Sequence, residues 1–218
     1  VLTVSIEPTH DFNDRSGMSS STRKKAVALW RTHLPDGDRE QLAKVLFGFE
    51  NPPGTTEVSG SQDSIGIVFP GVNRLHYEGG YWPTHIESVN DEAVLSFIEQ
   101  HLQLVPLGPR HDGYAVLSDT HIDAQGAMVL AKAAEDCWTA LKACDAQRFG
   151  EAFRRSFDAQ VAMFPHMVDD GIRAVIAKHA PGSLGWKLSG AGGGGYLILV
   201  RREDIPGALR ITIRRGAY

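Results

Sequence analysis

The sequence predicts an α+β protein in which helices pack on one face of a small sheet. Two long stretches, residues 124–143 and 145–163, place apolar side chains at helical spacing. Short apolar runs of strand type stand apart from these helices: one covers residues 196–200, and apolar and polar residues alternate at 209–213. Long helices combined with a few short strands are typical of this fold class.

Caps and helix breakers define the expected elements in the first half of the chain. A strand opens the chain at residues 1–6, and hydroxyl residues are N-cap candidates for a helix at 23–33. Asp38 begins a second helix, with Gln41 at capping-box spacing, and this helix ends at Asn51. The remaining expectations are a glycine-rich loop at residues 60–63, a strand or buried turn at 65–69, a strand at 74–77 and a helix at 91–100.

Residues 105–110 are the best candidate for a domain boundary. This stretch holds two prolines and a glycine, which cannot continue a helix or a central strand. We therefore expect one domain at residues 1–107 and another at 108–218. The second domain is expected to contain a strand at 113–118, the two long helices, a third helix at 172–179, and the strands at 196–200 and 209–213.

Composition and charge narrow the functional class. The chain has 218 residues, a formal net charge of −4 and 42% hydrophobic residues, as an ordinary soluble globular protein does. No run of like charges suggests nucleic acid as a partner, and no apolar stretch approaches the length of a membrane span. The cysteines Cys137 and Cys144 lie seven residues apart on one predicted helix, too far to form a disulfide, so we expect a cytoplasmic protein. The oligomeric state stays open, a homodimer included.

Five glycines in the six positions 190–195 require a backbone that passes close to something. The segment matches the G-x-G-x-x-G pattern of dinucleotide-binding folds, in which the glycines lead from a strand into a helix. Here a predicted helix and loop come before the glycines and a buried strand follows, which disfavours a nucleotide-dependent oxidoreductase. A tight turn between packed elements remains an alternative, although such a turn rarely needs more than one or two glycines.

The start of the first predicted helix offers a phosphate site. Gly17 and Met18 are followed by hydroxyl residues at 19–22, and the unpaired N–H groups and positive dipole end of a helix favour anions. Residues 23–25 add three positive charges nearby. A well-capped helix without a ligand is the alternative.

Two carboxylates stand thirteen residues apart, Glu50 at the end of a helix and Asp63 in a loop, with Glu57 between them. Carboxylates this close in sequence can meet across a site. One can then hold a hard cation while the other takes a proton from an attacking hydroxyl. Acidic residues in loops are usually only solvated, so this pair alone is weak evidence.

Together these segments resemble the GHMP kinases, the small-molecule kinases named for galactokinase, homoserine kinase, mevalonate kinase and phosphomevalonate kinase. Residues 17–22 are similar to the family's phosphate motif G-L-G-S-S-[SA], and residues 187–195 to its late motif K-x-[TSP]-G-A-G-G-G-G. Glu50 and residues 60–63 resemble the family's glutamate and its glycine-rich loop ending in aspartate. Residues 60–63, 117–120 and 184–187 look most like the L-fucose kinase and heptose-7-phosphate kinase group, which acts at the anomeric hydroxyl.

The resemblance implies a GHMP-kinase-like two-domain architecture. Residues 108–218 would form its C-terminal, ferredoxin-like α+β domain, and residues 1–107 would be the remainder of an N-terminal kinase domain that is incomplete. The implied activity is ATP-dependent phosphorylation of a hydroxyl on a sugar or sugar phosphate. The implied cofactors are ATP and Mg²⁺.

The resemblance also implies roles for individual residues. Ser21 and Glu50 would hold Mg²⁺, and Asp63 would orient or deprotonate the sugar hydroxyl. The residues implied to bind the ATP phosphates are Gly17, Ser19, Ser20 and Ser21. The glycine-rich turn that would press against the phosphate loop and the substrate comprises Gly190, Ala191, Gly192, Gly193 and Gly194.

Two features depart from the family pattern. Ser19 stands where the family has glycine at the third position of its phosphate motif, and the added Cβ lies where the family brings the backbone close to the phosphates. The family's early substrate-binding segment, rich in proline and glycine, has no counterpart in this sequence. A non-catalytic binding or scaffolding module derived from such a kinase is therefore the alternative function.

Overall fold

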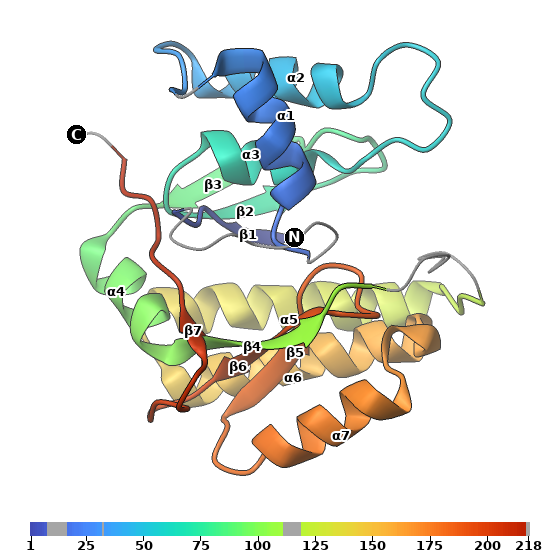
Figure 1. The fold of residues 1–218 in the computed structure, drawn as a ribbon, viewed down its shortest axis with the longest axis vertical. Coiled ribbons are helices and arrows are strands. Elements are labelled where there is room, and N and C mark those ends of the chain that lie inside the picture. The colour runs from blue at the N-terminus through green and yellow to red at the C-terminus, as the bar shows by residue number, and fades with distance from the viewer. Residues whose placement is uncertain (8–16, 32, 111–118, 217–218) are drawn as a thin grey trace. The chain divides into compact units, whose positions relative to one another are not determined.

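The computed structural model describes residues 1–7, 17–31, 33–110 and 119–216, and these fall into two compact units (Figure 1). The first unit comprises the described parts of Val1–His10, Ser19–Leu95 and Thr212–Tyr218. The second comprises the described parts of Asp11–Met18 and Ser96–Ile211.

The first unit combines a small antiparallel sheet with helices. Its strands lie in the order β1-β2-β3, and Val72 of β2 stands opposite both Val4 and Val89. The elements are β1 (Leu2–Val4), α1 (Ser20–Trp30), α2 (Arg39–Glu50), α3 (Ser61–Val68), β2 (Val72–His76), β3 (His85–Val89) and the beginning of α4 (Glu92–His101).

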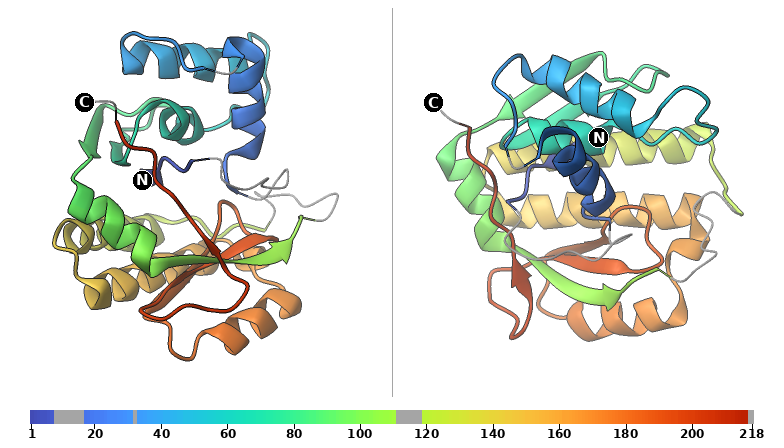
Figure 2. Two further views of the ribbon diagram at one scale, coloured as in Figure 1. Left: turned by 60° about the vertical axis from the view of Figure 1, so that its left-hand side comes forward. Right: turned by 45° about the horizontal axis from the view of Figure 1, so that its top comes forward.

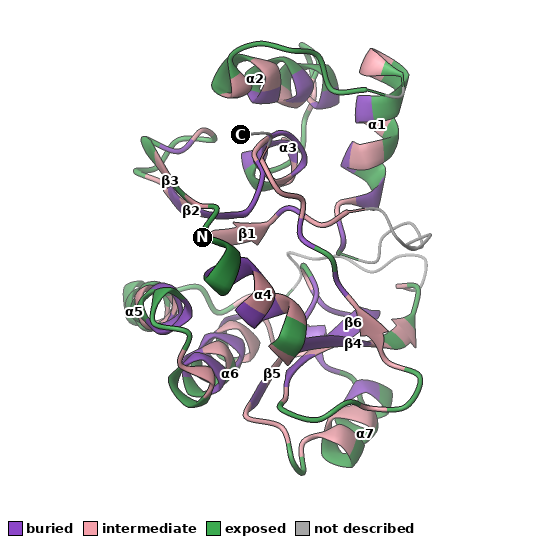
Figure 3. Cartoon of the chain, turned by 90° about the vertical axis from the view of Figure 1, so that its left-hand side faces the viewer, coloured by how far each residue is buried: buried purple, intermediate pink, exposed green. Residues whose placement is uncertain are grey.

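Side chains from three helices and one strand form the core of this unit. Leu46 of α2, Ile65 of α3 and Leu75 of β2 are almost completely buried. Figure 3 shows the resulting two-sided pattern on α2, with buried and exposed residues alternating along the helix. The amphipathic pattern therefore packs α2 on α3 and leaves its other face to solvent.

The second unit has a four-stranded antiparallel sheet in the order β5-β6-β4-β7. Helices α5 and α6 lie side by side in both views of Figure 2, and α6 packs against β5 and β6. The remaining elements are the end of α4, β4 (Leu102–Gly108), α5 (Ala124–Lys142), α6 (Ala146–Met163), the 3₁₀ helix η1 (Pro165–Met167), α7 (Asp170–His179), β5 (Gly185–Leu188), β6 (Gly195–Val200) and β7 (Leu209–Arg210).

The α+β fold class is confirmed, as are the long helices and the strand after the glycines. Asp38 caps α2 as expected, because its carboxylate accepts a hydrogen bond from the Gln41 amide at 2.8 Å. The first helix begins earlier than predicted, at Ser20. Cys137 and Cys144 are not joined by a disulfide.

No helix within the described ranges is both long and apolar enough to span a membrane. The predicted strand at 113–118 lies outside the described residues.

The strand or buried turn expected at residues 65–69 is wrong, because residues 65–68 belong to helix α3 and Phe69 is its C-cap. Ile65, Ile67 and Val68 are buried on more than one side of this short helix, and a short apolar run has the same pattern in a buried strand. Asp63 therefore lies in the first turn of a helix and not in a loop.

The expectation that residues 105–110 cannot belong to a central strand is also wrong, since β4 runs through Pro106. The pairing with β6 becomes irregular between Pro106 and Gly108, and β7 covers only Gln103 and Leu104. Proline is tolerated where a sheet ladder is already incomplete. The boundary between the two compact units lies between Leu95 and Ser96, whereas the sequence analysis placed it after residue 107.

A further strand, β5, stands directly before the glycines and was not predicted. The glycine turn is therefore the connection of an antiparallel hairpin, in which Leu188 pairs with Leu197. The last predicted strand is shorter than residues 209–213: β7 covers Leu209–Arg210, and Ile213 forms an isolated bridge with Ile6 in the first unit.

Candidate active site

The segment from Gly17 into α1 has a backbone that most side chains disfavour. Gly17 has φ of +73°, and Ser19, the residue before the helix, has φ of +54° in the left-handed region. The Ser19 side chain makes no capping hydrogen bond to α1. The first amides of a helix have no partner within the helix, so the start of α1 retains the anion-favouring character expected from the sequence.

Glu50, the last residue of α2, is held against α1. The Thr22 hydroxyl donates a hydrogen bond to Glu50 Oε1 at 2.8 Å, and Lys25 Nζ lies 3.5 Å from the same oxygen. Ser21, which the resemblance pairs with Glu50, is exposed. The hydroxyl that contacts Glu50 in the structure is thus that of its neighbour, Thr22.

The second carboxylate oxygen of Glu50 meets the chemical requirement for a metal ligand. The side chain is only 3% exposed, and Oε2 is buried without a hydrogen-bond partner. A buried, unsatisfied carboxylate oxygen is costly unless a cation or donor approaches it. No group of three His, Cys, Asp or Glu side chains gathers among the described residues. Mg²⁺ commonly uses one or two carboxylates together with substrate phosphates.

Asp63 lies close to both of these features. Ser19 Oγ donates a hydrogen bond to Asp63 Oδ1 at 2.9 Å. Burial raises the pKa of the Asp63 carboxyl above its ordinary value, the bond from Ser19 lowers it, and the neighbouring Glu50 carboxylate raises it. A carboxylate with a raised pKa is a better proton acceptor, so the environment of Asp63 suits a general base.

The sequence analysis missed Tyr77, which lies beside Asp63 through its contact with Ser61 of the segment 60–63. Ser61 Oγ lies 2.9 Å from the Tyr77 hydroxyl, and burial together with the charge of Asp63 raises the pKa of Tyr77. The phenol therefore stays protonated and can donate a hydrogen bond near Asp63. Tyr77 follows β2 directly, and no sequence signal connects that position with α3.

In the second unit, Gly17 packs against the glycine turn. A Cβ placed on Gly17 would lie 2.6 Å from the carbonyl carbon of Ser189, and one placed on Gly190 would lie 2.9 Å from Gly17 Cα. Real Cβ atoms do not approach backbone this closely. Both positions also have positive φ, so glycine is required there for conformation and for space.

The other glycines of the turn contact different segments. A Cβ on Gly192 would lie 2.8 Å from Met167 Cβ, and one on Gly194 would lie 2.9 Å from the backbone nitrogen of Arg110. The Gly193 amide donates to the Met167 carbonyl at 2.9 Å. Segments far apart in sequence thus approach one backbone turn, which explains why one or two glycines would not suffice.

Arg110 brings a positive charge to the turn. Its Nε donates a hydrogen bond to the Gly192 carbonyl at 2.6 Å, and its guanidinium also lies beside Gly190. The sequence analysis treated this residue as part of a domain boundary. Its position two residues after β4 becomes informative only once β4 is paired with β6.

Lys187, the lysine of the late motif, points away from the turn. Its ammonium donates to Ser156 Oγ at 3.0 Å and also bonds Gln160, both on α6. Burial lowers the pKa of Lys187 to about 8. Its contacts are those of a residue that joins β5 to α6.

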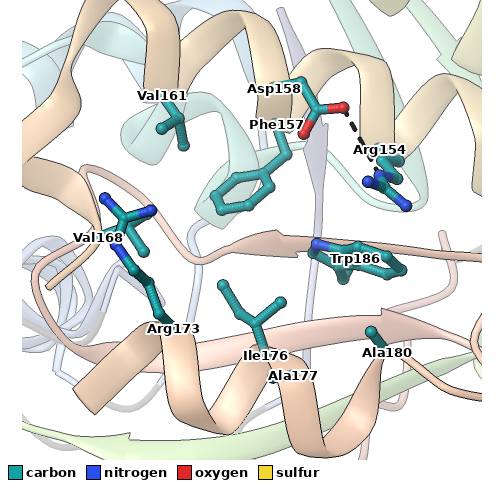
Figure 4. Close-up of a pocket in the computed structure, with 10 residues that line it drawn as sticks. All are labelled: Arg154, Phe157, Asp158, Val161, Val168, Arg173, Ile176, Ala177, Ala180 and Trp186. Carbon is teal, nitrogen blue, oxygen red and sulfur yellow. Dashed lines mark ion pairs between the residues drawn. The ribbon is translucent and has the colours of Figure 1, made fainter. Parts of the chain in front are cut away.

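A hollow of about 440 Å³ lies elsewhere in the second unit, between α6, α7 and β5 (Figure 4). Phe157, Ile176 and Trp186 point into it, and the guanidinium of Arg154 stacks on the Trp186 ring at 4.1 Å. Trp186, from the segment 184–187, lines this hollow, whereas no residue expected to bind phosphate or Mg²⁺ or to act as the base does. The candidate site is therefore defined by the motif contacts and not by this cavity.

The chain is similar in sequence to a known sugar kinase. No model of a protein family matches the chain. The bifunctional fucokinase/GDP-fucose pyrophosphorylase of Arabidopsis thaliana is 24% identical over 198 residues, which are 85% of this chain and 18% of that protein.

Two solved structures share the fold. A D-glycero-D-manno-heptose 1-phosphate kinase from Bacteroides thetaiotaomicron aligns with a TM-score of 0.56 and 15% identity, over 91% of this chain and 60% of that one. Lactococcus lactis galactokinase, solved with galactose, aligns with a TM-score of 0.64 and 14% identity, over 94% of this chain and 68% of that one.

The chain has the fold of GHMP kinases, so the resemblance stated from the motifs is confirmed at the level of the fold. It spans less than a fifth of the plant protein and three fifths of the heptose kinase.

Proposed function

We propose that this chain carries out the phosphate and acid–base chemistry of a GHMP-type kinase that transfers a phosphoryl group from ATP to a hydroxyl of a sugar or sugar phosphate. The observation that carries the proposal is the cluster at the start of α1. There the partly buried Asp63 and a Glu50 carboxylate with one unpaired oxygen lie beside a helix N-terminus that follows Gly17. Anion site, cation ligand and base are the three components that such a reaction needs.

In this proposal the amides of residues 17–20 bind the terminal phosphates of ATP, and Ser21 and Glu50 hold Mg²⁺. The Thr22 hydroxyl fixes the Glu50 carboxylate, and Lys25 supplies further positive charge near it. When bound, Mg²⁺ would neutralise charge on the terminal phosphates. The turn formed by residues 190–194 supports Gly17 through backbone contacts and needs no side chains.

The phosphoryl group moves in one displacement. The oxygen of the sugar hydroxyl forms a bond to the γ-phosphorus, the bond between that phosphorus and the bridging oxygen breaks, and ADP leaves with the bridging oxygen. Asp63 takes the hydroxyl proton. Positioning and charge neutralisation contribute more than the base, because the transferring group is loosely bonded in the transition state.

The substrate class rests on the names of similar proteins, which act on fucose, a heptose phosphate and galactose. We propose a sugar or sugar phosphate phosphorylated at the anomeric hydroxyl, as the motifs at residues 60–63 and 184–187 suggest. A non-catalytic binding module is the alternative that the following experiment separates.

Asp63→Asn tests the proposal. In the chain and in any longer polypeptide that contains it, ADP formation is measured with Mg²⁺, ATP and a panel of hexoses and heptose phosphates. Removing the base should lower turnover by at least about 100-fold. Binding of a non-hydrolysable ATP analogue should change less than about twofold, since Asp63 is not among the proposed phosphate ligands.

Glu57→Gln is the matched control, because Glu57 is an exposed carboxylate between the two proposed functional ones. Its turnover should equal that of the wild type. Unchanged turnover in Asp63→Asn would remove Asp63 from the mechanism. If the wild type binds the ATP analogue but phosphorylates no sugar in either polypeptide, the binding-module alternative replaces the kinase.

A further inference from the structure

Ser19 occupies a backbone conformation that a serine rarely adopts. Its φ of +54° and ψ of +24° lie in the left-handed region, where the Cβ of an L-residue is disfavoured and glycine is the usual occupant. The family motif has glycine at the equivalent position. A serine retained there costs stability, so its side chain should make a compensating contact.

That contact is with Asp63. A serine before a helix ordinarily accepts a hydrogen bond from a helix amide, but the Ser19 hydroxyl makes no such bond. It donates instead to Asp63 Oδ1 at 2.9 Å, across 44 residues of sequence. The side chain therefore links the start of α1 to the first turn of α3.

The hydrogen bond leaves the two oxygens of Asp63 in different states. Oδ1 is engaged by Ser19, and Oδ2 accepts no hydrogen bond from the described residues. The other groups that face Asp63 are Glu50 of α2, which is itself paired with Lys25, and Tyr77, which follows β2. Among them, Ser19 makes the direct hydrogen bond that fixes the orientation of the carboxylate.

We propose that Ser19 is a positioning residue, whose hydroxyl holds Asp63 through Oδ1 so that Oδ2 faces the substrate hydroxyl and accepts its proton. This inference rests on the proposed kinase function. It gives the Ser19 hydroxyl a role of its own, separate from the phosphate binding proposed for the amides of residues 17–20. A positioned carboxylate reacts faster, because it enters each cycle already in the productive geometry.

Two substitutions separate the hydroxyl from the backbone. Ser19→Gly removes the hydroxyl and relieves the left-handed strain, whereas Ser19→Ala removes the hydroxyl and keeps the strain. Both should lower kcat for the sugar by about 10-fold, the effect of losing one hydrogen bond to a charged group. In both variants KM for ATP should stay within about twofold of the wild-type value. Ser19→Ala should melt at a lower temperature than Ser19→Gly, because alanine keeps the strained left-handed conformation that glycine relieves.

A double-mutant cycle identifies the partner through which Ser19 acts. In an Asp63→Asn background, adding Ser19→Gly should produce no further loss of kcat, because the group that Ser19 positions is already gone. If the Ser19 hydroxyl binds phosphate, the two losses multiply and KM for ATP rises, and either result overturns the proposal. Ser88→Ala is the matched control, since Ser88 also donates a side-chain hydrogen bond within the first unit, to Asn73 at 2.6 Å.

The wild type, Ser19→Gly, Asp63→Asn and the double variant are also compared by urea unfolding, which requires no activity. A non-additive change in unfolding free energy between Ser19→Gly and Asp63→Asn supports the direct bond even if the kinase proposal fails for lack of turnover. Additive changes overturn the bond itself. If Asp63→Asn abolishes turnover while Ser19→Gly matches the wild type, the kinase proposal stands and the positioning role is refuted.

Discussion

Lys187→Met is expected to stabilise the protein at neutral pH and to remove a distinctive pH dependence. The Lys187 ammonium is buried beside α6, with Ser156 and Gln160 as its partners. No carboxylate within the described ranges forms an ion pair with it. Burial lowers the pKa of Lys187 from 10.5 to about 8. The charge is thus held in the folded state at a cost in free energy.

The magnitude follows from the two pKa values. The difference between 10.5 and about 8 corresponds to about 3 kcal/mol, since one pKa unit is about 1.4 kcal/mol. Between these values the unfolded chain retains a proton that the folded chain has lost, so the folded state gains stability as pH rises. Below pH 8 both states are protonated, and the folded state bears the full cost.

Cys137 opposes this trend at higher pH. Burial raises the pKa of its thiol from 9.0 to about 12, so the unfolded chain loses this proton first. Stability therefore falls as pH rises above about 9 through Cys137. The effect of Lys187 is read most cleanly between pH 7 and pH 9, as a difference between wild type and variant.

Urea unfolding at pH 7 and pH 9 provides the measurement. The wild type should gain about 1 kcal/mol relative to Lys187→Met over this interval. At pH 7 the variant should be more stable by about 1 kcal/mol, because the loss of two hydrogen bonds offsets part of the relieved charge burial. Lys178→Met, on the exposed side of α7, should follow the wild type. Parallel pH curves for wild type and Lys187→Met would refute the argument.

Three further substitutions have expected effects on stability, each measured by chemical denaturation. Gly192→Ala should destabilise by about 2 kcal/mol or more, since the residue has φ of +73° and a Cβ would meet Met167; an unchanged midpoint would contradict the packing of the turn. Asp38→Ala should cost about 1 kcal/mol through loss of the α2 cap. Thr22→Val should cost about 2 kcal/mol, because buried Glu50 Oε1 loses its hydroxyl donor.

Long periodic elements could be predicted because many residues contribute to one signal. Helices α5 and α6 each repeat the apolar pattern over several turns, and α2 adds a side-chain cap at Asp38. Short elements lack that redundancy. Helix α3 has eight residues, and β5 has four, Gly185–Leu188, with no alternation of apolar and polar residues. Their structure is decided by pairing and burial, which depend on distant parts of the chain.

The glycine turn was predictable in kind but not in detail. The sequence indicates that backbone passes close to backbone at residues 190–195, and the structure agrees. The sequence does not identify the segments that contact the turn, because Gly17, Arg110 and Met167 come from separate parts of the chain. A run of glycines in the sequence shows that side chains do not fit at these positions. Which segment takes up the space depends on how the whole chain folds.

The start of α1 shows where a motif stops being sufficient. The motif supplies adjacent hydroxyls, but successive helical residues point about 100° apart, so helix phase decides which hydroxyl meets which carboxylate. Ser19 reaches Asp63 and Thr22 reaches Glu50, whereas Ser21 is exposed. Ser19 lies before the helix in the left-handed region and Thr22 lies in its first turn, so the two carboxylates meet the same end of α1. Asp63, with twelve residues between it and Glu50, lies near enough to the Glu50 charge for that charge to add to the rise in pKa that burial causes.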